Sequence, residues 1–173
     1  MDDNSKIRKI IKTTLNEFLN ETYKTTYDKE FNSFKEWAYE YAKDNAQGFN
    51  NIDDAIKYLN WFFEVYENVP QVMTLYRILY LEKKSDLNRK TIGLHFTDNN
   101  KNFDNGFLQN LGFSRSEIDS GKFYIITINV NRNDIDWENT VATRLQHPYE
   151  DEYTLKRTAK YKISSIEKWE ENF

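Results

Sequence analysis

The stretch QVMTLYRILYL, residues 71–81, decides the fold class of this chain. It follows Pro70, is rich in β-branched and aromatic residues, and ends at the charged segment EKKSDLNRK, so we expect a β-strand. Arg77 stands in its middle among residues that favour burial. A buried guanidinium needs a partner, and carboxylates or phosphates fit its planar fork. The alternatives are a purely structural arginine–carboxylate pair and an outward-facing arginine on a half-exposed strand.

Four further segments share this strand character: TIGLHFT (91–97), GKFYIITINV (121–130), DEYTLK (151–156) and AKYKISSIE (159–167). Segments rich in Asn, Asp and Gly separate them. We expect only one short helix between them, in GFLQNLGFSRSEI (106–118). Strands that follow one another with so little helix indicate a mostly antiparallel sheet.

Before Pro70 the pattern is helical. Apolar residues recur at spacings of three and four, which is typical of amphipathic helices, and we expect helices over about residues 5–19, 28–45 and 53–66. The sequence therefore predicts an α+β protein. Its helical N-terminal region, residues 1–68, would pack on a mostly antiparallel β core, residues 69–173.

The composition narrows the function class. The chain of 173 residues has no Cys, which excludes disulfides and thiolate metal sites and suits the reducing cytosol. It contains no apolar run of signal-peptide or membrane-span length, so we expect a cytoplasmic protein without membrane association. The net charge of −4 gives no basic footprint, so nucleic acid is not an expected partner. Abundant Lys, Asn, Asp, Tyr and Ile would suit the AT-rich genome of a bacterium or phage.

Several common sites are excluded by their residues. Asp98, Asn100 and Asn102 have the spacing of a calcium loop, but Phe103 stands where such a loop needs Gly. The two histidines, His95 and His147, have no thiol near them, and we expect no metal site. With only 5 Gly, the chain shows no phosphate-binding loop and no nucleophile elbow.

One pair of acids remains, Glu150 and Glu152 in HPYEDEYTL. Alternate residues of a strand face the same side, so both carboxylates would project into one space. They repel each other unless a cation or a substrate hydroxyl lies between them, which is costly for structure and useful for chemistry. The alternative is an edge strand whose acids face water.

The order of these elements resembles the ADP-ribosyltransferase family, in its arginine-serine-glutamate class. A strand with a central Arg, the strand TIGLHFT, a late strand with Glu-x-Glu and a final strand AKYKISSIE carry the resemblance over about residues 70–167. It implies an NAD-dependent mono-ADP-ribosyltransferase fold and activity, with NAD as co-substrate and a protein as acceptor. An NAD glycohydrolase on the same fold and a catalytically inactive binding module are the alternatives.

The resemblance also implies roles on the NAD side of the site. Arg77 would hold the dinucleotide phosphates, and Ile78 would affect how the nicotinamide amide is held. Glu152 would bind the nicotinamide ribose and stabilise the oxocarbenium-like centre as nicotinamide departs. Where the family usually has Ser-Thr-Ser, this chain has His95-Phe96-Thr97. The ring of His95 and the hydroxyl of Thr97 would then support the ribose and the catalytic glutamate.

On the acceptor side, Glu150 would orient or deprotonate the incoming nucleophile. A glutamate at this position resembles the arginine-modifying branch, so an arginine side chain is the expected acceptor. The segment ATRLQHPY, residues 142–149, would form the turn that presents the acceptor, with Tyr149 as a contact.

Overall fold

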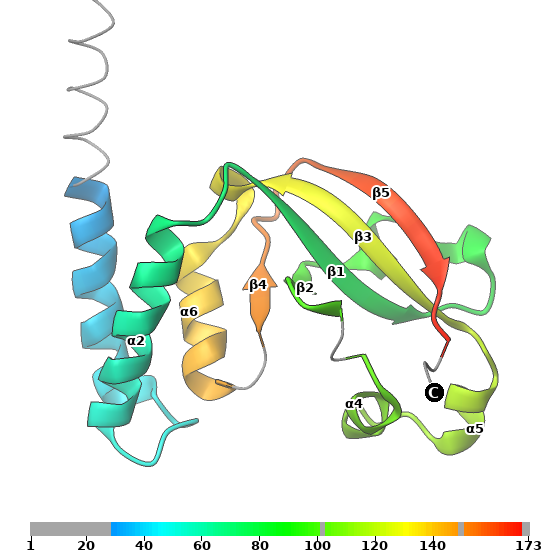
Figure 1. Ribbon diagram of the computed structural model, residues 1–173, viewed down its shortest axis with the longest axis horizontal. Coiled ribbons are helices and arrows are strands. Elements are labelled where there is room, and N and C mark those ends of the chain that lie inside the picture. The colour runs from blue at the N-terminus through cyan, green and yellow to red at the C-terminus, as the bar shows by residue number, and fades with distance from the viewer. Residues whose placement is uncertain (1–28, 101–102, 149–150, 171–173) are drawn as a thin grey trace, which may run out of the picture.

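The computed structural model describes residues 29–100, 103–148 and 151–170 (Figure 1). These residues form an α+β architecture with N-terminal helices and a five-stranded antiparallel sheet, which confirms the predicted class. The helix expected over residues 5–19 lies outside the described residues. No helix in the described part is long and apolar enough to cross a membrane.

In the part of the chain that the structure describes, two helices precede the sheet. Residues 29–45 are helical, and α2 (Ile52–Glu67) follows, so both predictions in this region are confirmed. Asn51 caps α2 by accepting a hydrogen bond from the Asp54 amide at 3.0 Å, and the helix stops shortly before Pro70. The two helices pack through aromatic rings, among them Phe31 stacked on Tyr66 with centroids 5.2 Å apart.

The sheet has the order β4-β2-β1-β3-β5, and neighbouring strands are antiparallel. All five strands lie within the predicted segments or one residue beyond them: β1 (Val72–Tyr80), β2 (His95–Thr97), β3 (Phe123–Asn131), β4 (Glu152–Thr154) and β5 (Tyr161–Lys168). β1 and β3 pair along their full length, from Val72 opposite Asn131 to Tyr80 opposite Phe123. β1 and β2 pair only at Tyr76 and Thr97, so the β2–β4 pair diverges from the rest of the sheet.

The later helices differ from the sequence-based expectation. The single short helix expected over residues 106–118 is two helices, α4 (Asn105–Asn110) and α5 (Arg115–Asp119). Gly112 lies between them with a φ of +90°, a conformation that a side chain disfavours. A four-residue helix, α3 (Arg89–Ile92), precedes β2.

Helix α6 (Trp137–Gln146) was not predicted. It includes residues 142–146 of the segment expected to be an acceptor-presenting turn, so that expectation is wrong up to Gln146. Asp136 begins the helix by accepting a hydrogen bond from the Asn139 amide at 3.2 Å. Val141 and Leu145, one turn apart, are buried among the N-terminal helices, and this tertiary packing outweighs the modest helix propensity of the segment.

Three apolar clusters hold the fold together. One runs along the sheet from β3 to β4 and includes Leu75, Ile126 and Tyr153. The buried residues of a second cluster all come from helices, namely residues 29–45, α2 and α6. A third packs α4 and α5 against one end of β1 and β3, around Phe123. Helix α6 lies between α2 and β4 (Figure 1) and carries the contact between the N-terminal helices and the strand bearing Glu152.

Candidate functional site

A cleft of about 740 Å³ brings most of the expected site residues together. It lies among β1, β2, β4 and α4, and its size is in the range of small-molecule sites. Five expected site residues line it: Arg77, Ile78, His95, Thr97 and Glu152. The other two, Tyr149 and Glu150, lie outside the described residues, so their expected roles stay predictions.

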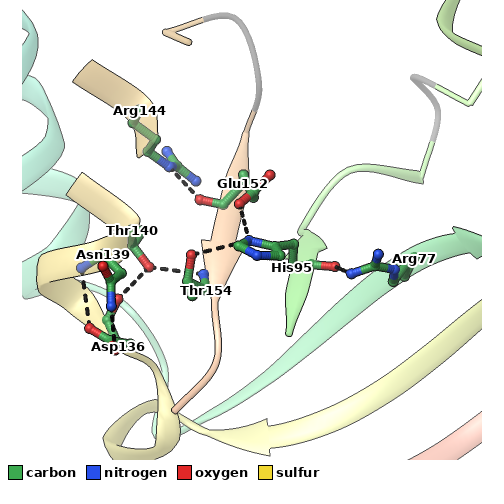
Figure 2. Close-up of polar contacts among 8 residues, drawn as sticks. All are labelled: Arg77, His95, Asp136, Asn139, Thr140, Arg144, Glu152 and Thr154. Carbon is green, nitrogen blue, oxygen red and sulfur yellow. Dashed lines mark hydrogen bonds and ion pairs between the residues drawn. The ribbon is translucent and has the colours of Figure 1, made fainter. Parts of the chain in front are cut away.

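The centre of the site is a contact between His95 and Glu152 (Figure 2). β2 and β4 are antiparallel with Thr97 opposite Glu152 and His95 opposite Thr154, which sends these side chains to one face. His95 Nδ1 contacts Glu152 Oε1, and Thr154 Oγ1 lies 3.5 Å from the same nitrogen. The Glu152 side chain is 21% exposed, so a partly desolvated carboxylate faces the cleft.

Arg77 reaches this pair from the neighbouring strand β1. Its Nη1 donates a hydrogen bond to the main-chain oxygen of His95 at 2.7 Å. Among the residues that the structure describes, Arg77 forms no ion pair, so the expected carboxylate partner is not found there. Burial lowers the pKa of Arg77, while the charge of Glu152 opposes this shift. A half-buried cation with one main-chain partner keeps further N–H donors for an anionic ligand.

Gly93 makes room for this arginine, which the sequence analysis did not recognise. A Cβ atom at Gly93 would lie 3.0 Å from Arg77 Nη1, and the residue has a φ of +70°. The conformation disfavours a side chain, and any added Cβ would press on the guanidinium of Arg77. Its position two residues before β2 was the available sequence signal.

Thr97 and Ile78 also line the cleft. Thr97 Oγ1 accepts a hydrogen bond from the Asn99 amide at 3.1 Å, which fixes the hydroxyl where β2 ends. Ile78 is 9% exposed and belongs to the apolar cluster around Phe123. It therefore has a packing role in addition to lining the cleft.

Aromatic side chains also line the cleft. They are Tyr76 on β1, Phe103 just before α4 and Phe107 on α4, and none was expected from the sequence. Asp104 orients this wall by accepting a hydrogen bond from the Phe107 amide at 2.7 Å. No periodic signal in the sequence indicates that these rings face Arg77.

The arrangement combines a half-buried cation, a partly desolvated carboxylate and apolar ring surfaces in one cleft. Such a set suits a ligand that has an anionic group, a flat ring and hydroxyl groups. Within the described ranges, no group of three or more His, Asp or Glu side chains could hold a metal ion.

No protein-family model matches this chain, and neither a curated protein nor a solved structure matches it.

Proposed function

We propose that this chain is an NAD-dependent mono-ADP-ribosyltransferase that moves ADP-ribose to a protein acceptor, with an arginine side chain as the acceptor group. The observation that supports this most is the meeting of Arg77 and Glu152 in one cleft, with His95 between them. A half-buried guanidinium and a partly desolvated carboxylate are what the diphosphate and the ribosyl cation of NAD respectively require.

In the proposed reaction, the bond between the anomeric carbon of the ribose and the nicotinamide nitrogen breaks. Its electron pair stays with nicotinamide, which leaves as a neutral molecule, and positive charge develops on the ribose. Glu152 stabilises that charge because its carboxylate is shielded from water and held by His95 at Oε1. The other oxygen, Oε2, has no hydrogen-bond partner among the described residues and is the atom we assign to the ribose 2′-hydroxyl.

His95 holds the carboxylate, and Thr97 lies beside it, where the resembled family usually has a hydroxyl-rich strand. The His95 ring bonds Glu152 directly, and Thr97 lies opposite Glu152 in the β2–β4 pairing. Transfer is completed when a guanidinium nitrogen of the acceptor forms a bond to the anomeric carbon and passes its proton to Glu150.

Two assays with the purified chain test the proposal. The first follows nicotinamide release from NAD, and the second follows a label from the adenylate part of NAD onto proteins of a cell lysate, with the modified side chain identified by mass spectrometry. We expect both nicotinamide release and arginine-linked label. Nicotinamide release without label on protein would favour the NAD glycohydrolase. No consumption of NAD would favour the inactive binding module.

A further inference from the structure

Strand β4 lies at the edge of the sheet, and helix α6 covers its outer edge. β2 pairs with β4 on one side. On the other side, the Asp136 amide donates to the Thr154 oxygen at 2.8 Å, and the Thr154 amide donates to Thr140 Oγ1 at 3.0 Å (Figure 2). Groups from α6 and its cap therefore take the place of a neighbouring strand.

Arg144 supplies the third contact of this kind. It lies one helical turn after Thr140, so both side chains face β4. Its Nε donates to the main-chain oxygen of Glu152 at 2.8 Å (Figure 2). Its guanidinium carbon lies 4.5 Å from the ring centroid of Tyr153 and 5.7 Å from that of Phe62. Arg144 therefore bonds the backbone of Glu152 and packs on the ring of Tyr153.

For packing alone, a buried arginine at this position would cost stability. It is 2% exposed, and its Nη2 is buried without a hydrogen-bond partner among the residues that the structure describes. Burial disfavours the charge, but Tyr153, Tyr58 and Asp151 outweigh this effect and keep the pKa of Arg144 above its ordinary value. A buried charge with an unmet donor costs stability, and an apolar side chain of similar size is often neutral or better.

Arg144 does not line the cleft, so it is no candidate for contact with NAD. Its hydrogen bond ends at Glu152, whose side chain contacts His95 on the cleft side. We propose that Arg144 is a positioning residue, which fixes the backbone of β4 so that the Glu152 carboxylate stays against His95 and points into the cleft. This inference rests on the proposed function, since it assigns Glu152 the catalytic role.

The test compares three variants of the full chain. Arg144→Met keeps length and apolar contact but removes the Nε donor, Arg144→Lys keeps a charge and one donating group, and Val141→Ala removes buried volume from the same helix without touching β4. For Arg144→Met we expect kcat for nicotinamide release to fall about tenfold, with KM for NAD changed less than about twofold and the unfolding midpoint equal or higher. Arg144→Lys should recover part of kcat. Val141→Ala should lower the unfolding midpoint and leave kcat at the wild-type value.

Hydrogen exchange of the Thr154 amide gives a readout that needs no activity. Faster exchange in Arg144→Met, with wild-type exchange in β1 and β3, supports the positioning role, and unchanged exchange overturns it. If the wild type releases nicotinamide and Arg144→Met retains full kcat, the inference fails while the proposed function stands. If the wild type never releases nicotinamide, the proposed function fails and the catalytic part of the inference fails with it.

Discussion

The two halves of the sheet are built differently. β1 and β3 are each nine residues long, pair along their full length and bury side chains such as Leu75, Ile126 and Ile128 completely. β2 and β4 are three residues each and carry His95, Thr97 and Glu152. The long half supplies stability through continuous main-chain pairing and buried surface. The short half has less main-chain pairing. It buries Phe96 and Tyr153 in the core but presents polar side chains to the cleft, and Arg77 and Arg144 bond its backbone.

This difference indicates that the residues responsible for stability and those of the proposed chemistry are largely separate in this chain. Short, weakly paired segments on a rigid scaffold are where binding and catalytic groups commonly lie. Substitutions of the cleft-facing polar residues in the short half should therefore change activity more than stability, and those of buried residues in the long half the reverse.

The largest effect is expected at Glu152 in the short half. Glu152→Gln keeps the shape and removes the charge, so nicotinamide release and transfer should both fall by about 10³-fold. Its contact with His95 is partly exposed, so the free energy of unfolding should change by about 1 kcal/mol or less. Steady-state kinetics and urea unfolding measure the two quantities.

Glu150→Gln is the matched control for the charge. It should suppress transfer to protein while slow hydrolysis of NAD continues, because Glu152 still supports the ribosyl cation. Wild-type rates in both variants would mean that this acidic pair is only a solvated strand edge.

In the long half, Ile126→Ala should have the opposite effect. Ile126 is fully buried on β3 and does not line the cleft, so its loss should lower the free energy of unfolding by about 2–5 kcal/mol. Urea unfolding measures this change, and kcat per folded molecule should stay at the wild-type value. A large fall in kcat would show that the two halves are coupled and would break the comparison.

A substitution of Arg77 tests a residue shared by the two halves, because Arg77 belongs to the long strand β1 but bonds the backbone of β2. Arg77→Lys keeps the charge and loses the planar fork, so NAD binding should weaken by about 1.5–3 kcal/mol. Isothermal titration with NAD measures this change, and Ile126→Val, a conservative change in the sheet outside the cleft, is the control. Unchanged affinity in a folded Arg77→Lys protein would remove Arg77 from the site.

Gly93→Ala should give the smallest effect. The left-handed backbone conformation costs about 1–2 kcal/mol for an alanine, and the new methyl group would press on Arg77 Nη1. We expect this loss in urea unfolding together with weaker NAD binding. Gly112→Ala, also at positive φ but with no atom within 4 Å of the added group, controls for backbone strain alone. Equal NAD affinity in both variants would show that Gly93 does not serve Arg77.

The local sequence was sufficient for most of the fold. Runs of β-branched and aromatic residues define β1 and β3, and three-to-four spacing defines the helices of residues 29–45 and 52–67, because these patterns record directly which face is buried. The order of short motifs in the sequence also indicated Arg77, His95 and Glu152 as candidate site residues. They line one cleft because β2 lies between β1 and β4 in the sheet.

Only the tertiary structure decided the parts that depend on partners distant in sequence. Helix α6 has a weak local signal and forms because Val141 and Leu145 find a buried surface between the N-terminal helices and the sheet. Nothing near Gly93 in the sequence indicates that Arg77 needs its space, and nothing near Arg144 indicates that it bonds the backbone of Glu152. Sequence periodicity reports which face of a segment is buried, whereas these contacts depend on which segments become neighbours.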